Sequence, residues 1–389
     1  MTSRKEAGIY ERLGVAPIIN AAGDLTKFGG RLMSERVVTA MLQASSASVV
    51  IDELQAFAGK RISQVTHSEA AYVVPGAAAG LALAAASCMI VKNMLVAEEL
   101  PRLPTGAADQ ILIYRDHLTR YARMLEVTGA KVRVVEGPDE MKTALTKGSV
   151  AAFCFLHSGN DTPELFETTV RLTSESGIPM IVDAAVSLPP LVNLHRYSDA
   201  GADMVVFSGG KAIGGPQASG FVCGRVDLVT TVAKLHLGPG AIAIGRPMKV
   251  GKEEIVGLLE AIEEYLTRPH ESELSTWRRS MERLSRSLGS FSGVKVTVEN
   301  NLPNGRPLPC VVLKFIAEPS RASLLAKMLL DGSPRIALDT SRESFGELLI
   351  YPANLRLDED EIIAAAIKRN LAKIDFDQVV EKMDEYENY

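Results

Sequence analysis

A glycine-rich turn around Lys211 is the segment of this sequence with the clearest capacity for chemistry. Residues 204–207 form an apolar run typical of a buried parallel strand, and Ser208-Gly209-Gly210-Lys211 follows directly. A lysine in this place lies at the carboxyl end of a strand, where open α/β sheets bind their ligands. Glycines on both sides let the backbone approach a ligand closely. We therefore expect Lys211 to act on a bound molecule, with a structural lysine in a tight turn as the alternative.

The same turn is not a nucleotide-binding P-loop. That pattern, G-x-x-x-x-G-K-[ST], needs a glycine five residues before Gly210 and a Ser or Thr after Lys211. The chain has Val205 and Ala212 at these positions. The lysine turn therefore belongs to another kind of ligand site.

Asp183 ends a second apolar run, residues 180–182, so its carboxylate is predicted at the same sheet edge as Lys211. A buried carboxylate is costly unless a positive charge pairs with it. The protonated pyridine nitrogen of pyridoxal 5′-phosphate (PLP) is such a charge, and keeping it protonated makes PLP an electron sink. For Asp183 alone, a helix N-cap is the simpler interpretation. Together with Lys211, it predicts a PLP site in which Lys211 carries the cofactor as a Schiff base.

Other residues could complete that site. Gly76, Ala77 and Ala78 open an alanine-rich helix whose N–H groups and dipole suit a phosphate, and Ser208 adds a hydroxyl. A glycine-containing helix start without a ligand is equally compatible with this segment.

Three polar residues stand at predicted strand ends. Either imidazole of His117 and His157 could stack on the cofactor ring, and Asn160 could bond the ring hydroxyl. Ordinary hydrogen-bonded histidines are the alternative. The sequence contains no H-E-x-x-H motif, so we predict no catalytic metal.

The elements that must position these residues alternate along the chain. Apolar runs at 110–114, 150–156, 180–182 and 204–207 are separated by helical or loop stretches at 118–126, 163–176 and 191–200. This alternation predicts an α/β fold with a mostly parallel sheet, to which 219–223 adds an antiparallel strand. The nearly uncharged segment 70–91 predicts a buried helix on the sheet and not a membrane span, because much of its apolarity is alanine.

Four regions are expected. Residues 1–35 form an arm, 36–245 a large PLP-binding domain, 246–288 connecting helices, and 289–389 a small α+β domain. In the small domain, strands at 294–298 and 310–315 alternate with helices at 320–330 and 358–373.

Composition narrows the class of protein. The 389 residues carry 42 basic and 47 acidic side chains, so no uniform basic field is available for nucleic acid. The four cysteines are scattered, which argues against a disulfide framework or zinc site and indicates a reducing compartment. The first residues do not form a signal peptide. We expect a cytoplasmic protein without membrane or nucleic-acid partners.

Residues 207–220, FSGGKAIGGPQASG, resemble the cofactor-lysine signature of the family that contains bacterial selenocysteine synthase (L-seryl-tRNA selenium transferase) and D-glucosaminate-6-phosphate ammonia-lyase. The segments VAPIINAAGDLTKFGG at 15–30 and IGRPMKVGKEEI at 244–255 are also similar to this family. The likeness is greater to the ammonia-lyase branch, because selenocysteine synthases typically have Asp where this chain has Gly210.

The resemblance implies an aminotransferase-like, fold type I PLP enzyme, assembled as a homodimer or higher homo-oligomer with a shared active site. It implies Lys211 and Asp183 as the catalytic residues. Fold type I enzymes often hold the substrate carboxylate with a small-domain arginine, but the matching stretch here offers Asn354. The candidates for binding a substrate anion are Arg31, Arg246, Arg342 and Arg356.

The activity expected from the resemblance is α,β-elimination. A β-hydroxy amino acid or amino sugar acid, such as D-glucosaminate or its 6-phosphate, would lose its β-hydroxyl and release ammonia and a 2-keto acid. An L-seryl-tRNA selenium transferase is one alternative, and a PLP-dependent racemase or aldolase is another. A PLP-fold scaffold without activity is the non-enzymatic alternative.

Overall fold

The computed structural model describes residues 8–157, 161–237, 243–302 and 306–374. Two compact units divide the chain at His270. The larger comprises Gly29–His270, and the smaller comprises Glu271–Leu302 with the two ends of the chain, Met1–Phe28 and Pro307–Tyr389. The four regions expected from the sequence stay a prediction.

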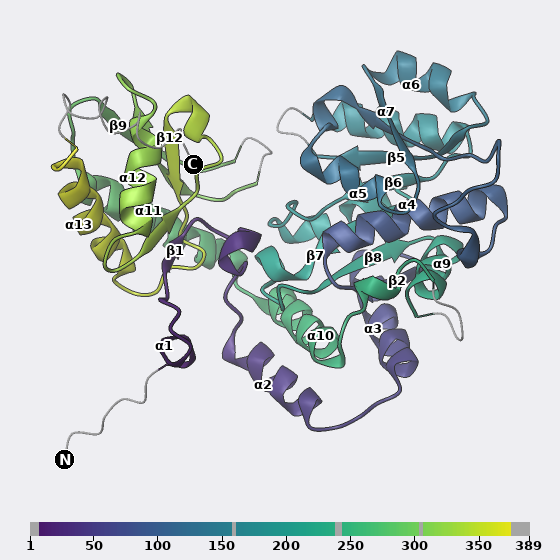
Figure 1. Ribbon diagram of the computed structural model, residues 1–389, viewed down its shortest axis with the longest axis horizontal. Coiled ribbons are helices and arrows are strands. Elements are labelled where there is room, and N and C mark those ends of the chain that lie inside the picture. The colour runs from purple at the N-terminus through teal and green to yellow at the C-terminus, as the bar shows by residue number, and fades with distance from the viewer. Residues whose placement is uncertain (1–7, 158–160, 238–242, 303–305, 375–389) are drawn as a thin grey trace. The chain divides into compact units, whose positions relative to one another are not determined.

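A seven-stranded sheet forms the centre of the larger unit (Figure 1). Its strands in spatial order are β2 (Ala70–Val74), β8 (Gly220–Gly224), β7 (Met204–Ser208), β6 (Met180–Asp183), β5 (Val150–Leu156), β3 (Gln110–Tyr114) and β4 (Lys131–Val135). The five strands from β7 to β4 are parallel, whereas β8 pairs antiparallel with both β7 and β2. The four predicted parallel strands and the predicted antiparallel strand are therefore confirmed.

Helices cover both faces of this sheet because its strands are apolar on both sides. In β5, Phe153 and Phe155 belong to one buried cluster, whereas Cys154 and Leu156 belong to the other. The first cluster includes residues of α2 (Glu35–Ser45), α3 (Ile51–Thr66), α6 (Pro138–Leu145), α7 (Pro163–Glu175), α8 (Arg196–Asp199) and α10 (Lys252–Thr267). The second includes residues of α4 (Ala77–Asn93), α5 (Arg123–Glu126) and α9 (Val226–Leu237). Two helical layers around one sheet are the expected α/β architecture.

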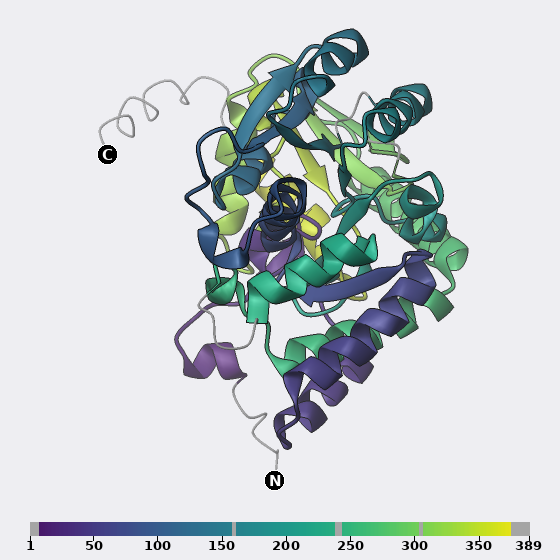
Figure 2. The same ribbon diagram turned by 90° about the vertical axis from the view of Figure 1, so that its right-hand side faces the viewer.

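The segment 70–91, expected to be one buried helix, is a strand followed by a helix. Its first residues form β2, and the helix α4 begins at Ala77, after Pro75 and Gly76. The strand lies at the sheet edge, where α3 protects it (Figure 2). The amide of Gln55 bonds both backbone groups of Val73, at 3.0 and 3.1 Å. A Cβ on Gly59 would lie 2.3 Å from the carbonyl oxygen of Ala71, so only glycine permits this approach.

The smaller unit packs the helices α11 (His270–Leu288), α12 (Arg321–Leu330) and α13 (Glu359–Leu371) against a three-stranded antiparallel sheet. The strand order is β12 (Glu347–Ile350), β10 (Cys310–Phe315) and β9 (Val294–Glu299). Apolar residues of α11, α12 and α13 share one buried cluster with this sheet. Near the start of the chain lie α1 (Ile9–Arg12) and β1 (Ile19–Ala21), and β1 pairs in parallel with β11 (Ile336–Leu338).

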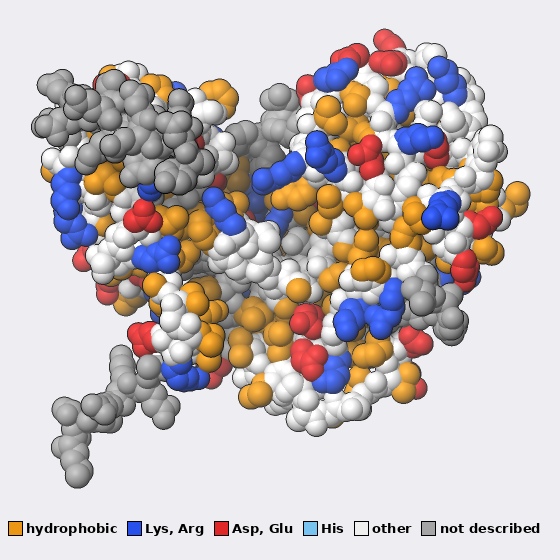
Figure 3. Space-filling model, in the orientation of Figure 1, with side chains coloured by type: hydrophobic (Ala, Val, Ile, Leu, Met, Phe, Trp, Pro, Cys, Tyr) orange, Lys and Arg blue, Asp and Glu red, His pale blue; other side chains and the backbone are white. Residues whose placement is uncertain are grey.

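The structure shows the state of the cysteines, the character of the helices and the distribution of charge on the surface. All four cysteines are buried and free, as expected from their scattered positions. Among the described residues, no helix combines the length and apolarity that a membrane crossing requires. On the face shown in Figure 3, basic side chains lie among acidic and apolar ones.

Candidate functional site

The predicted functional residues follow strands that all end at one edge of the sheet. Because β8 is antiparallel to both β2 and β7, these two strands point the same way as β6, β5 and β3. Leu156, Asp183 and Val206 are register partners across β5, β6 and β7. Val74 and Ser208 both pair with Gly220. The edge therefore presents, in spatial order, the start of α4 at Gly76, the turn with Ser208 and Lys211, then Asp183, His157 and His117.

Lys211 lies in a π-helical turn, Gly209–Ile213, directly after β7. Its backbone, with φ −113° and ψ −126°, departs from helical geometry inside this turn. Two backbone hydrogen bonds of 2.9 Å, from Gly209 to Ser219 and from Gly215 to Gly209, hold the turn against the following loop. Within the described part of the chain, Nζ of Lys211 has no hydrogen-bond or ion-pair partner. The turn therefore fixes the backbone and leaves the amine available.

Glycines make this turn possible. A Cβ on Gly210 would lie 2.6 Å from Cα of Gln217, and one on Gly209 would lie 2.2 Å from Oγ of Ser219. A backbone atom cannot retreat as a flexible side chain can, so Gly210 admits no side chain without moving the loop. An Asp here, as is typical of selenocysteine synthases, would therefore require the loop at Gln217 to move in this chain.

Two arginines support the far side of the turn. Arg31 donates from Nη1 to the carbonyl oxygen of Ala212 at 3.2 Å, and Arg268 donates from Nη1 to the same oxygen at 3.1 Å. The backbone N–H of Arg31 also donates to the carbonyl of Gly210 at 3.0 Å. Arg31, predicted as an anion ligand, is therefore placed against the lysine turn. Arg268 was not predicted, because no sequence pattern links it to residue 212.

Asp183 forms no ion pair with any of the residues that the structure describes. Its Oδ1 accepts a hydrogen bond of 3.0 Å from the backbone N–H of Ala185. Desolvation raises the pKa of this carboxyl group, while the bond from Ala185 and the electrostatic interactions with Lys211 and His157 lower it less strongly. The side chain is partly exposed, but the enclosure of its carboxyl group outweighs these favourable interactions. A protonated pyridine nitrogen fits such a site.

The start of α4 fits a phosphate. Gly76 is the N-cap, with φ +124° in the region that favours glycine, and no side chain caps the helix. Gly220 approaches it so closely that a Cβ there would lie 3.0 Å from Cα of Gly76. The N–H groups of Ala77 and Ala78 follow in the first turn. The hydroxyl of Ser208 makes no hydrogen bond within the described part of the chain.

A carboxylate that the sequence analysis missed joins the two predicted histidines. Oδ1 of Asp161 lies 2.8 Å from Nε2 of His117, and Oδ2 lies 3.2 Å from Nδ1 of His157. A carboxylate can only accept, so these two ring nitrogens carry the protons. The other nitrogens, Nδ1 of His117 and Nε2 of His157, are buried and have no hydrogen-bond partner among the described residues. The spacing His157-x-x-x-Asp161 was the only sequence signal for this arrangement.

The remaining predicted residues are less closely tied to this edge. Asn160 lies outside the described residues, so its predicted role is not described. Arg246 is exposed in a short 3-10 helix, Arg246–Met248, of the larger unit. Arg342 and Arg356 belong to the smaller unit. Arg342 is paired with Glu299 at 3.1 Å and Glu347 at 3.4 Å, which leaves it less free for a substrate.

The chemistry of this donor set matches PLP. Counting only partners in the part of the chain that the structure describes, it offers an unpaired lysine amine, a carboxylate whose pKa burial raises, a helix start without a side-chain cap and two buried ring nitrogens without hydrogen bonds. The lysine amine suits the aldehyde of PLP, the carboxylate its pyridine nitrogen and the helix start its phosphate. The two ring nitrogens could bond polar groups around the cofactor ring. The residues present fit the group that the sequence resemblance implied.

Known proteins are similar in sequence to this chain, in one case over 93% of its length. A 5′-C-glycyluridine monooxygenase-decarboxylase from Streptomyces sp is 31% identical over 377 residues, 93% of this chain and 92% of the relative. D-glucosaminate-6-phosphate ammonia lyase from Salmonella typhimurium is 27% identical, covering 75% and 78% of the two chains. L-seryl-tRNA(Sec) selenium transferase from Aquifex aeolicus is 25% identical, covering 82% and 76%. No model of a protein family matches the chain.

Solved structures agree on the fold. A structure of D-glucosaminate-6-phosphate ammonia-lyase superposes with a TM-score of 0.77 at 25% identity, covering 95% of this chain and 99% of the other. A Thermus thermophilus aspartate aminotransferase double mutant gives a TM-score of 0.53 at 16% identity, covering 93% of each chain. The predicted aminotransferase-like α/β fold is confirmed.

Proposed function

Because the chain belongs to the family that includes 5′-C-glycyluridine monooxygenase-decarboxylase, D-glucosaminate-6-phosphate ammonia lyase and L-seryl-tRNA(Sec) selenium transferase, we propose that it is a PLP-dependent enzyme acting at the α-carbon of a β-hydroxy amino acid. The observation that carries this proposal is the common sheet edge, where Asp183 ends β6, Lys211 follows the neighbouring β7, and the two side chains interact electrostatically. A sheet edge with a purely structural role does not require an unpaired lysine beside a carboxylate whose pKa is raised by burial.

The compounds in the relatives' names point to a substrate class. A glycyl nucleoside, an amino sugar acid and a seryl group each have an amino group on the carbon next to the carboxyl function. In each, the following carbon carries oxygen. A β-hydroxy amino acid built on a sugar combines these features. The leading reaction is elimination of its β-hydroxyl followed by release of ammonia.

The net conversion is R–CH(OH)–CH(NH2)–COOH to R–CH2–CO–COOH and NH3, with one water lost and one taken up. Bound PLP supplies an electron sink that stabilises negative charge at the α-carbon. Lys211 would hold the cofactor at rest and, once the substrate amine has taken its place, accept the α-proton on Nζ. The same Nζ can return that proton to the departing hydroxide. Asp183 would hold positive charge beside its carboxylate, and Ser208 with the N–H groups of Ala77 and Ala78 would bind the phosphate.

Asp161 would act through the histidines and is therefore a positioning residue. Its carboxylate orients both rings and fixes the nitrogens that remain for other partners. The predicted homodimer with a shared active site stays part of this proposal.

Oxidative decarboxylation is the second candidate, favoured by the 31% identity to the monooxygenase-decarboxylase over 93% of this chain. It would begin at the same α-carbon and use the same lysine and aspartate. It differs from elimination in its co-substrate and products, because it consumes O2 and releases CO2.

The test is a substrate panel with the purified, PLP-loaded protein. D-glucosaminate, its 6-phosphate and 5′-C-glycyluridine are incubated in air and without oxygen, and ammonia, 2-keto acid, CO2 and O2 uptake are measured together. Elimination predicts ammonia and keto acid in equal amounts, with or without oxygen. Oxidative decarboxylation predicts CO2 only in air, matched by O2 uptake.

Lys211→Ala is the decisive variant, with Lys234→Ala on α9 as a surface control. Lys211→Ala should lose the visible absorption of lysine-bound PLP and all turnover, whereas the control should retain both. Normal turnover by Lys211→Ala would contradict the proposal.

A further inference from the structure

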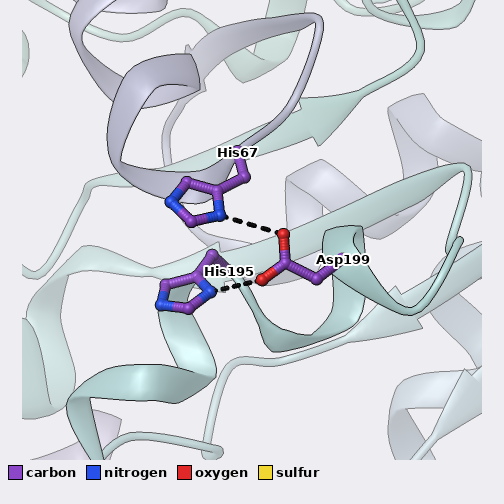
Figure 4. Close-up of side chains that lie close together, drawn as sticks. All are labelled: His67, His195 and Asp199. Carbon is purple, nitrogen blue, oxygen red and sulfur yellow. Dashed lines mark hydrogen bonds and ion pairs between the residues drawn. The ribbon is translucent and has the colours of Figure 1, made fainter.

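Two histidines and an aspartate meet on the larger unit outside the PLP-site residues. His67 ends α3, His195 precedes α8, and Asp199 is the last residue of α8. Nδ1 of His67 lies 2.9 Å from Oδ1 of Asp199, and Nδ1 of His195 lies 2.5 Å from Oδ2. The two rings stack with their centroids 4.2 Å apart. Figure 4 shows both Nδ1 atoms turned toward the carboxylate and both Nε2 atoms turned away from it.

The backbone at His67 is specialised. Its φ of 50° and ψ of 37° lie in the left-handed region, where a non-glycine residue is uncommon. A helix end of this shape is ordinarily occupied by Gly or Asn. Here the αL cap instead places the imidazole of His67 over that of His195. His195 lies 128 positions further along the chain, directly before α8.

Two imidazoles and a carboxylate form a donor set of the type that binds zinc and similar ions. The three groups offer ligand atoms within 4.8 Å of one another. Ligand atoms on one tetrahedral ion at about 2.0–2.2 Å lie roughly 3.3 Å apart, so the rings need to withdraw only slightly from Asp199. Each ring would move its proton from Nδ1 to Nε2, the nitrogen turned away from the carboxylate, and present the Nδ1 lone pair.

We infer that His67, His195 and Asp199 form a binding site for a divalent transition-metal ion of the zinc type. The ion joins the end of α3 to α8 and has room for further ligands from solvent, because all three side chains are partly exposed, at 53%, 30% and 47%. Its place, apart from Lys211 and Asp183, makes it a structural site in the fold and not a part of the proposed reaction. The inference is independent of the proposed function.

The experiment uses the full-length, PLP-loaded protein after removal of metal with a chelator. Bound Zn²⁺ is measured by equilibrium dialysis, and the Tm is measured with and without Zn²⁺. Wild type should bind one ion per chain through this cluster, with a Tm rise of a few degrees when Zn²⁺ is in about 100-fold excess over Kd. Co²⁺ should give d–d absorption bands characteristic of nitrogen and oxygen ligands.

Three variants test the ligands one at a time. His67→Asn keeps the left-handed backbone, which Asn tolerates, and removes the imidazole. His195→Gln and Asp199→Asn are close in size to the original residues. Each should weaken Zn²⁺ binding by more than about 100-fold, because losing a direct ligand costs more than losing a supporting contact. His270→Gln, a histidine outside the cluster that bonds the carbonyl of Tyr265, should bind as wild type does.

Binding that the three variants leave unchanged would overturn the inference, since the ion would then lie elsewhere. So would wild-type protein that takes up no stoichiometric ion. In either case the cluster is only a hydrogen-bonded link between α3 and α8.

Discussion

Nε2 of His117 lies 2.8 Å from Oδ1 of Asp161, a residue 44 positions along the chain. The same carboxylate holds His157, so one acidic side chain orients two imidazoles behind the ends of β3 and β5. Each ring keeps one buried nitrogen that no group in the described ranges of the chain contacts by a hydrogen bond. Leaving a buried polar atom unsatisfied costs about 1–3 kcal/mol, so these nitrogens are expected to gain partners when cofactor or substrate binds.

Asp161→Asn should therefore lower kcat more than it changes KM. An amide can donate to one ring nitrogen and accept from the other, so it releases one imidazole from its present tautomer. We expect a loss of about 10–100-fold in kcat and a shifted pH–rate profile, as for other residues that orient a functional imidazole. Asp139→Asn, at an exposed position of α6, is the matched control. An unchanged pH profile in Asp161→Asn would remove Asp161 from the functional site.

Gly210→Ala should disturb the lysine turn. Its Cβ would meet the backbone of Gln217 at 2.6 Å, and such overpacking typically costs about 1–3 kcal/mol. The backbone must shift next to Lys211, so PLP occupancy and Tm should both fall. Gly148→Ala, where a Cβ meets nothing within 4 Å, is expected to stay within about 0.5 kcal/mol of wild type. Full PLP occupancy in Gly210→Ala would mean that the turn adjusts freely.

Asp183→Asn should stabilise the apoprotein while it impairs the enzyme. Burial raises the pKa of Asp183, so the folded state holds a proton more tightly than the unfolded chain and loses stability as pH rises through this range. At neutral pH the charged carboxylate is thus a net cost. Asn can still accept from Ala185, and we expect the apoprotein to gain roughly 0.5–2 kcal/mol, a typical gain at such sites.

The same variant should bind PLP without holding its ring nitrogen positive, and activity should drop sharply. Unfolding of the apoprotein by urea at pH 7 and turnover of the loaded protein give the two readouts. A less stable apoprotein would show that the carboxylate is already compensated.

His236 should make stability fall in mild acid. Its Nε2–H donates to the carbonyl of Met248 at 2.7 Å, and its Nδ1 lies 3.0 Å from the hydroxyl of Tyr72, which can donate to a neutral ring. Burial lowers the pKa of His236 below its usual value near 6.5. As pH falls below about 6.5, the unfolded chain binds a proton at His236 more readily than the folded protein does. The free energy of unfolding therefore decreases.

The measurement is the free energy of unfolding of wild type and His236→Gln between pH 7.5 and 5.5. The variant should have a shallower dependence on pH, by up to about 1.36 kcal/mol per pH unit, the value for one proton. Parallel curves for the two proteins would show that His236 does not titrate between the folded and unfolded states.

Periodicity predicted the centre of the sheet but not its margins. The strands β3, β5, β6 and β7 are continuous apolar runs because both of their faces are buried, and this pattern needs no partner to be recognised. In β4, Lys131 and Arg133 interrupt the run, since this strand lies at the sheet edge. In β2, the apolar residues continue into α4 without a change of composition, so the strand was merged with the helix.

The site shows the same division. Lys211, Asp183 and the glycines around them were predicted because strand ends and turn residues are local features, and local sequence specifies them. Asp161 and Arg268 were missed because their roles depend on partners 44 and 56 positions away. No local rule states which side chain will reach such a partner.

The sequence by itself thus determined five strands of the large sheet, the lysine turn and the type of cofactor to expect. Tertiary structure alone decided which polar atoms meet: the shared carboxylate of His117 and His157, the two arginines on Ala212, and the meeting of His67 with His195 and Asp199. The physical reason is that backbone conformation follows from neighbouring residues. Hydrogen bonds between distant side chains depend on how the sheet brings its strands together.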